Sequence, residues 1–479
     1  MIPLHEMAGT NRYFRTGLML CLLIGSIVFV WEGQWFWLAL APLFLLGLAG
    51  LSNPSLIYYL LLFSLPISVE WQLTETLGTD LPDEVLMWAM SLLVMLSLLL
   101  RPGFWLNRKA DQPLLAFLLL HLAWILFTAT LSVQPILSFK FLAAKLWYVV
   151  AFAAGSWWFL TDGKSLRIAF RCLVLPMTLA LLWVLFNQAR EGFLFDSVNA
   201  AVKPFFRNHV NYGAILVCLL PLPVAMAVIR KKERTWWIVC TMVWLVALFF
   251  SYSRGAWAAL LVGGMACLLL YYRRVITAMW ISLLLALGLL FYFFQDNRYL
   301  DYRPDFDQTI YHQDFSDHLQ ATYRLKDLST AERFHRWIAG VRMVAEEPIL
   351  GHGPNRFYEA YKPYTVTAFR TYVSDNPEHS TVHNYFLLLA AEQGLPGLVF
   401  FLLIIMRMFS IIQDAYRRSA NRKEKTGWMV MASVLAMIVW LNMLSDLVEA
   451  DKIGSLFFIC LGICLGAERW QQKKQVGNS

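Results

Sequence analysis

Long apolar runs, separated by short polar segments, constrain this chain more than any other feature of its sequence. A run of about 18 or more apolar residues is long enough to cross a bilayer as a helix. The composition agrees, because 59% of the 479 residues are hydrophobic and only 15% are charged, against roughly 25% in a soluble protein. The sequence therefore predicts an all-α polytopic membrane protein.

The apolar runs predict about fourteen transmembrane helices. Their expected positions are 16–31, 35–51, 55–70, 84–100, 113–131, 138–160, 167–187, 211–229, 235–250, 255–272, 275–294, 384–408, 427–446 and 453–467. Arg12 and Arg15 precede the first run as they would in a signal peptide, but no small-x-small cleavage site follows it. We therefore expect a retained first helix.

The placement of charge sets the expected orientation. With the N-terminus in the cytoplasm, the basic segments fall in inner loops; they are 101–109, 163–167, 230–234, 273–274, 417–425 and 468–474. The short outer loops are neutral or acidic; they are 33–34, 70–84, 132–135 and 448–451. This positive-inside pattern predicts two cytoplasmic termini. It also explains the net charge of +8 without nucleic-acid binding, which would concentrate the basic residues on a soluble module.

Two outer segments depart from this pattern, since 188–210 keeps several basic residues and 295–383 is one long polar insertion. Seven of the nine histidines lie in these two segments or at their edges. We expect 295–383 to be a large periplasmic loop containing short helices, which carries the chemistry. The predicted parts of the chain are then about nine spans in 1–250, two in 251–294, the loop 295–383, and the C-terminal helices with a basic tail in 384–479.

The stretch SYSRGAW places Arg254 at the outer end of the tenth predicted helix. Small residues around it, Ser253 among them, allow another backbone or a lipid head group to approach closely. An arginine at the membrane rim can snorkel to water. It can equally bind a phosphate, because the guanidinium fork matches phosphate oxygens. The residues alone leave both interpretations open.

A second stretch, AERFHRWIAGVRMVAEEPILGHGPNRFYEAY at 331–361, begins with a helical pattern that places Arg333 and Trp337 on one face. Pro348 then ends the helix, and Gly351 with Gly353 predicts a tight turn. Such a turn can bind an anion through its backbone, or it can simply connect two elements.

A third stretch, HSTVHNYFLLLAAEQGLPGLVFFLL at 379–403, places His383 where the polar insertion re-enters the membrane. An imidazole there suits a general base, since its unperturbed pKa is near 6.5. A helix-capping or interfacial histidine would look the same. Glu392 lies inside the following helix and must face protein or a cavity, because a carboxylate is costly in lipid.

Taken together, these three stretches resemble the bacterial O-antigen ligase and polymerase family over about 250–405. The resemblance implies a glycosyltransferase of the cytoplasmic membrane whose donor is a glycan on a polyprenyl diphosphate at the periplasmic face. In the ligase branch the acceptor is the sugar of lipid A–core. The resemblance also implies an enzyme without a metal, a nucleotide sugar or another cofactor.

The resemblance gives Arg254 and Arg333 the role of binding the donor diphosphate, and His383 that of activating the acceptor hydroxyl by direct, inverting displacement. Arg207, in the other arginine-bearing outer segment, is a candidate for a further phosphate contact or a solvated loop charge. Ser253, Gly353 and Glu392 are expected to support the site. Lys145, near the outer end of the sixth predicted helix, is explained by snorkelling.

Two further features bear on metal and redox chemistry. The stretch RPDFDQTIYHQDFSDH at 303–318 could bind a metal through its carboxylates and imidazoles, or could be an ordinary acidic loop; those residues are Asp305, Asp307, His312, Asp314, Asp317 and His318. The cysteines at 21, 172, 218, 240, 267, 460 and 464 all lie in apolar segments, which favours buried thiols over disulfides or metal ligands.

Three alternatives to a ligase stay open. A polymerase, or a transferase of oligosaccharide to protein, would use the same donor chemistry with another acceptor. A transporter of a lipid-linked glycan or an anion belongs to a different class. It would show charges paired near the bilayer midplane and broken helices.

Overall fold

A computed structural model describes residues 53–74, 77–302, 328–370, 374, 376 and 380–468. Within them, nine helical segments are long and apolar enough to cross a membrane. They are α5 (Asp83–Leu100), α7 (Gln112–Leu131), α8 to α9 (Pro135–Phe159), α10 (Gly163–Arg190), α12 with α13 (His209–Ile229), α15 (Arg254–Tyr271), α16 with most of η4 (Val275–Asp301), α20 (Tyr385–Arg418) and α21 (Arg422–Leu444). The chain is thus a nearly all-α, multi-pass membrane protein.

Each expected helix from residue 54 onward coincides with a helical segment of the structure, but the count of fourteen stays a prediction. The expected helices 16–31 and 35–51 lie outside the described residues. Three others coincide with helical segments of fewer than 18 residues. These are α4 with η1 (Pro54–Ile67), α14 (Arg234–Phe249) and α22 (Asp451–Leu465).

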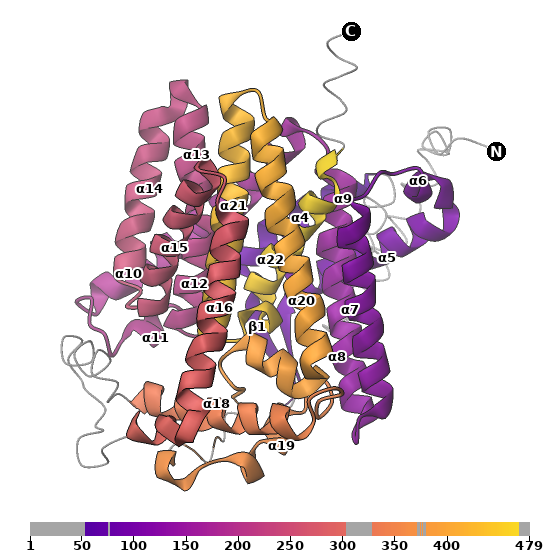
Figure 1. Cartoon of the computed structure of the whole chain (residues 1–479). Helices are drawn as coiled ribbons and strands as arrows, with labels where there is room; N and C mark the ends of the chain where they lie inside the picture. Colours follow the sequence, from indigo (N-terminus) through magenta and orange to yellow (C-terminus); the bar gives the residue numbers. More distant parts are fainter. Residues whose placement is uncertain are drawn as a thin grey trace, which may run out of the picture.

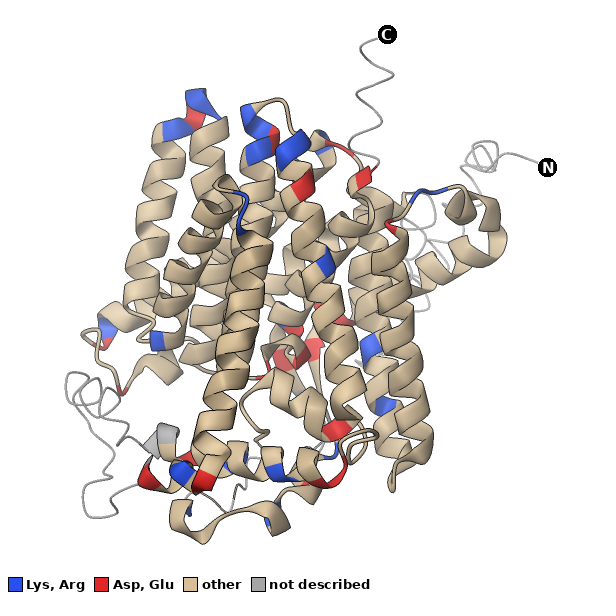
Figure 2. Cartoon of the chain, viewed as in Figure 1, with Lys and Arg blue, Asp and Glu red and all other residues tan. Residues whose placement is uncertain are grey.

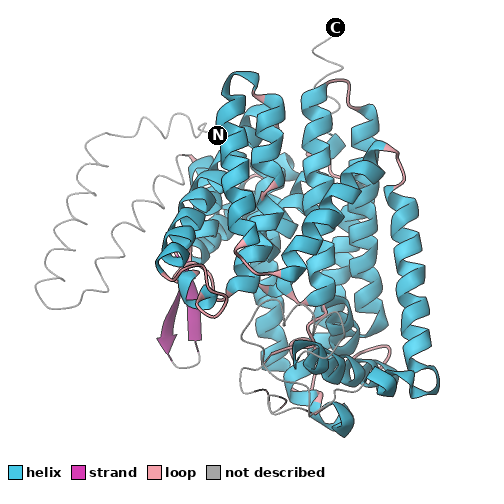
Figure 3. Ribbon diagram, turned by 90° about the vertical axis from the view of Figure 1, so that its left-hand side faces the viewer, coloured by secondary structure: helices cyan, strands magenta, loops and turns pink. Residues whose placement is uncertain are grey.

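A β-hairpin replaces the end of the expected helix 55–70 and most of the loop after it, so that boundary was wrong. Strands β1 (Val69–Thr74) and β2 (Leu77–Leu81) pair antiparallel, with Val69 opposite Leu81. Figure 3 shows the two strands beside the helical bundle. The sequence Val-Glu-Trp-Gln-Leu-Thr alternates apolar and polar residues, which is the period of a strand rather than of a helix.

The core of the bundle is built around α22, which lies among the other helices in Figure 1. Every residue from Ile453 to Leu465 is buried. A methyl group on Gly462 would collide with the carbonyl oxygen of Ala153 in η2 (Val149–Ala154), so the two backbones are in close contact. Small residues allow such approach between helices where lipid gives no hydrophobic driving force.

Helix α16 (Val275–Phe294), in contrast to α22, is almost entirely unburied. Val275 is its one buried residue, while Trp280, Leu284 and Phe291 are more than half exposed. An apolar helix exposed along its whole length is unfavourable in water and favourable in lipid. The exposed face of α16 therefore identifies a lipid-facing side of the bundle.

Charged residues divide between the two ends of the bundle. Figure 2 shows lysines and arginines gathered at the end that holds the α13–α14 and α20–α21 turns. The opposite end carries α18 (Leu328–Glu346), α19 (Phe357–Ala360), η5 (Lys362–Tyr364) and η6 (Thr367–Phe369). This separation follows the predicted alternation of basic inner loops and other outer loops.

The polar insertion is attached to the bundle through a small apolar cluster of its own. Tyr299, Ile338 and Phe369 form its buried centre, and Phe294 and Phe334 pack against it. The cluster joins the end of α16 to α18 and η6. The described part of 295–383 contains α18 and the shorter α19, η5 and η6, and the expected periplasmic loop stays a prediction. The four-part division of the chain is untested and stays a prediction.

Candidate functional site

A tight turn between α14 and α15 positions Arg254 as the first residue of α15. Tyr252 adopts the left-handed backbone conformation, with φ of 52°, which is uncommon for a non-glycine residue. Its hydroxyl donates to the Phe193 carbonyl at 2.5 Å, and Ser251 Oγ donates to the Leu248 carbonyl at 2.7 Å. These contacts fix the direction in which the chain enters α15.

Ser253 lies buried at the N-cap position of α15, where it packs against α12 (His209–Leu219). A methyl group on Gly213 would lie 2.6 Å from Ser253 Cβ, so α12 approaches the turn as closely as glycine permits. Arg207 lies two residues before α12 and its side chain is exposed. The structure thus brings the Arg207 segment to the helix that packs on the Arg254 turn.

Helix α18 carries two arginines on one face. Arg333 is half-buried and lies close enough to His383 to affect its pKa. Arg336, one turn later, is buried and its Nη1 lies 2.8 Å from Nε2 of His383. Glu332 holds Arg336 through an ion pair at 3.3 Å and accepts from Ser374 Oγ at 2.6 Å.

His383 is held in an unusual backbone conformation just before α20. Its φ is 55°, in the left-handed region, while Asn384 caps α20 by accepting from the Leu387 amide at 3.1 Å. Burial, then the positive charges of Arg336 and Arg333, lower the pKa of His383 to about 3. The ring is half-buried, as an interfacial imidazole would be, but its pKa lies well below 6.5, so in this state the ring is neutral at physiological pH.

The Arg254 and His383 segments both contact the C-terminal part of α21. The Trp440 indole donates to the Gly255 carbonyl at 3.3 Å, and the Tyr385 amide donates to the Ser445 carbonyl at 3.1 Å. Three segments far apart in the sequence, those of Arg254, Arg333 and His383, therefore converge on one region of the fold.

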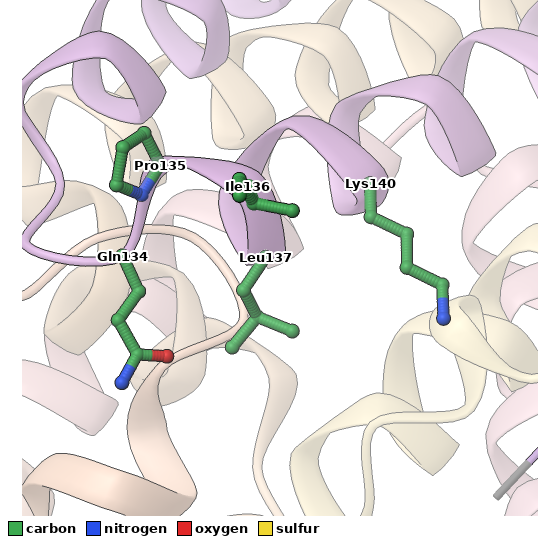
Figure 4. A pocket seen from close by; sticks show the side chains of 5 residues that line it. All are labelled: Gln134, Pro135, Ile136, Leu137 and Lys140. Carbon is green, nitrogen blue, oxygen red and sulfur yellow. The ribbon is translucent and has the colours of Figure 1, made fainter.

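A cavity elsewhere in the described structure does not involve these residues. It has a volume of about 400 Å³ beside the start of α8 (Pro135–Tyr148) and is lined by Gln134, Pro135, Ile136, Leu137 and Lys140. Figure 4 shows Gln134 and Leu137 side by side, with Lys140 extending away from them. Because its lining residues are mostly exposed and apolar, this hollow fits a lipid-facing surface better than a site for group transfer.

Glu392 faces protein, as predicted, and fastens the Gly353 turn to α20. Its two carboxylate oxygens accept from the amides of Asn355 and Phe357 at 2.8 and 2.9 Å. Its backbone carbonyl accepts from the Gly353 amide at 2.9 Å. Helix α20 is broken beside these contacts at Gly394, which has φ of 69°.

Gly353 itself has φ of 102°, and a methyl group there would collide with Ser132 in the α7–α8 turn. The amides of His352 and Gly353 both donate hydrogen bonds to α20, His352 to the Ala391 carbonyl and Gly353 to the Glu392 carbonyl. The observed contacts of this turn are therefore those of a connector that joins three elements.

Lys145 does not snorkel, so that interpretation was wrong. Its side chain is 6% exposed, and Nζ lies 2.6 Å from Oε1 of Glu449. The Tyr385 hydroxyl lies 3.4 Å from the same nitrogen. Snorkelling was inferred from depth alone, whereas a partner 304 residues away holds the ammonium group inside the bundle.

Sequence reasoning missed Glu332 and Arg336. The motif considered there was Arg333-x-x-x-Trp337, and Arg336 falls between its two ends. A signal was present, since Glu332 and Arg336 are four apart and such pairs face each other on a helix. That Arg336 also reaches His383 depends on the packing of α18 against α20, which no local pattern gives.

The described residues were expected to hold neither disulfides nor thiolate metal sites, and their acidic, histidine and cysteine side chains are arranged as follows. They hold no group of three or more His, Cys, Asp or Glu side chains placed to bind a metal ion. The Asp/His cluster at 305–318 lies outside them. The six described cysteines have free thiols and lie within helices, and Cys21 lies outside the described part of the chain.

Comparison with known protein families gives a match that covers this region of the chain. Residues 237–402 match the model of the O-antigen ligase family, a range that includes Arg254, Arg333, His383, Gly353 and Glu392. A comparison with curated proteins finds no match. The resemblance carried by the three motifs is thus confirmed, and residues 237–402 of this multi-pass membrane protein are similar to the O-antigen ligase family.

Proposed function

We propose that the chain is a membrane glycosyltransferase that moves a glycan from a polyprenyl diphosphate to a sugar hydroxyl of lipid A–core. The family match supports the reaction class. The observation that carries the proposal is the position of two arginines of α18 beside His383, inside the matched region. This arrangement provides cations for a diphosphate and an imidazole for a hydroxyl.

In this proposal Arg254 and Arg333 bind the donor diphosphate, and Arg207 adds an outer contact. Negative charge grows on the diphosphate as the glycosidic bond breaks, so fixed guanidinium groups stabilise the transition state more than the ground state. Three arginines would supply this charge without a metal or another cofactor. Ser253 keeps the Arg254 turn compact, and Glu392 and Gly353 fix the loop that follows α18.

His383 is the proposed general base for the acceptor. The acceptor oxygen forms a bond to the anomeric carbon while the carbon–oxygen bond to the diphosphate breaks. The lipid diphosphate leaves with that electron pair, and the hydroxyl proton moves to Nε2 of His383. Attack from the side opposite the leaving group inverts the anomeric configuration.

The proposed site faces the periplasm. The end of the bundle with the basic α13–α14 and α20–α21 turns then faces the cytoplasm, as the positive-inside rule requires. Both termini are expected on the cytoplasmic side of the inner membrane. The donor would thus be used on the periplasmic side.

Reconstitution tests the proposal directly. Purified protein in proteoliposomes receives an undecaprenyl-diphosphate glycan and lipid A–core, with and without chelator, and the glycolipid product is measured. We expect R254A, R333A and H383A to lose transfer by about 100-fold or more, because each removes a transition-state contact. R342A, an exposed arginine on the same helix, should keep wild-type activity.

Full activity in any of the three variants would contradict the assigned roles, and loss with chelator would contradict metal independence. The same liposomes separate the alternatives. Elongation of one lipid-linked glycan by another would identify a polymerase, and transfer to a protein acceptor would identify a protein oligosaccharyltransferase. Movement of unchanged donor across the bilayer would identify a transporter.

A further inference from the structure

The contact between Arg336 and His383 fixes which imidazole nitrogen carries the proton. Arg336 keeps its positive charge in proteins and has only N–H donors, so it must donate to His383. The acceptor is Nε2, at 2.8 Å from Nη1. A neutral imidazole that accepts at Nε2 carries its proton on Nδ1. In this state His383 offers a donor at Nδ1, and its basic nitrogen is covered.

That arrangement conflicts with the role of a base unless Arg336 moves. The lone pair on Nε2 is the only one the neutral ring has, and it is already used. No hydrogen bond joins Nδ1 to another described residue, and His383 as a whole is half-buried. The acceptor hydroxyl can therefore reach His383 productively only after Nε2 is released.

Arg336 is bound in a way that allows such a release. Its Nη1 is shared between His383 and the Thr381 carbonyl at 3.3 Å, and its Nη2 contacts Glu332 at 3.3 Å. Its buried Nε has no hydrogen-bond partner in the described part of the chain. A phosphate oxygen is a stronger acceptor for a guanidinium than a neutral imidazole is, because both partners are then ionised and two N–H groups can bind in parallel.

We propose that Arg336 is a positioning residue that covers Nε2 of His383 and uncovers it when a diphosphate binds beside Arg333. This inference rests on the proposed function, since it takes a lipid diphosphate as the donor. Diphosphate oxygens attract the Arg336 fork, Nε2 becomes free, and the imidazole can then accept the proton of the acceptor hydroxyl. The contact between Arg336 and His383 thus keeps the basic Nε2 atom covered until the donor is bound.

The charges around His383 agree with this device. Helix α18 contributes Arg333, Arg336 and Glu332. From the turn after α21, Asp446 accepts a hydrogen bond from the Thr381 side chain, and burial raises the pKa of Asp446. The charges that shift the pKa of the ring are thus the two cations, and a bound diphosphate would offset them.

Nitrogen NMR of ¹⁵N-histidine protein in lipid nanodiscs tests the inference without any turnover. The chain has nine histidines, and subtraction of the H383Q spectrum identifies the His383 signals. At pH 7 we expect wild type to show a protonated Nδ1 and an unprotonated Nε2. R336Q should shift the population toward the Nε2–H tautomer, and R342Q, the matched control on the same helix, should leave it unchanged.

Addition of undecaprenyl diphosphate without a glycan completes the test. Binding is followed separately by the quenching of tryptophan fluorescence, and the expected result is a change of the Nε2 signal in wild type but not in R336Q. A bound diphosphate that leaves the wild-type Nε2 signal unchanged would overturn the release. A protonated Nε2 in the free wild type would overturn the covering contact. If undecaprenyl diphosphate did not bind at all, a polyprenyl diphosphate would be excluded as the donor, and the proposed function would be contradicted with it.

Discussion

At the scale of the single residue, His383 shows how far an environment can move a side chain from its expected behaviour. Its place in the sequence predicts an interfacial imidazole, and the residue does lie where the polar insertion meets α20. Its neighbours Arg336 and Arg333 come from a helix some fifty residues earlier, so their effect on its pKa is invisible to a linear motif. The position of His383 was therefore predictable from the sequence, whereas its lowered pKa was not.

The lowered pKa of His383 predicts a pH-dependent loss of stability. The folded value is about 3 and the unfolded value about 6.5, so the stabilising contribution is complete above pH 6.5 and declines as the pH falls toward 3. Between pH 7 and 5.5 we expect wild type to lose about 1 kcal/mol through this group. Thermal unfolding in detergent at the two pH values measures it; an equal loss in H383Q would refute the assignment.

At the scale of the element, helices were predictable and their interruptions were not. Apolar runs of sufficient length predicted where the helices from residue 54 onward lie, because burial in lipid requires that length, but they did not fix the helix ends: α20 runs to Arg418 rather than to 408. The hairpin at 69–81 and the break in α20 both depend on local backbone chemistry inside or beside such runs. The sequence EQGLPG contains the glycine and proline that allow the break, but the turn that fills it comes from 348–355.

The break in α20 predicts a contrast between two glycines. A methyl group on Gly394 would collide with the Ile349 carbonyl, and its φ of 69° disfavours any other residue. G394A should therefore destabilise the protein by about 2 kcal/mol or more. G427A is the matched control, because Gly427 lies within α21 and nothing surrounds the added methyl; helix propensity predicts a gain of up to about 1 kcal/mol. Equal melting temperatures for the two variants would contradict the packing of this turn.

At the scale of the whole molecule, the alternation of charge predicts how the bundle lies in the membrane. The convergence of three distant segments could be anticipated only through the family resemblance, since hydropathy places helices along the chain and not beside one another. Contacts such as Lys145 with Glu449, between helices far apart in sequence, emerge only when the bundle is assembled.

Cysteine labelling of intact cells measures that orientation. Val133 is 82% exposed in the α7–α8 turn, and Lys232 is exposed in η3 (Lys231–Glu233) at the basic end. A membrane-impermeant maleimide should label V133C from outside and should label K232C only after the cells are opened. Unmodified protein serves as the control for its native thiols, and the reverse pattern would invert the proposed topology.

Helix α16 has a mechanical consequence for the proposed site. Along most of its length it exposes apolar side chains suited to lipid, and its last residue, Phe294, packs into the cluster that carries α18. Tilting is one way in which such a helix accommodates a change in the hydrophobic thickness of the lipid, and a change of tilt would pull on the platform that holds Arg333 and Arg336. The bilayer in this way becomes a structural component of the enzyme as well as its solvent.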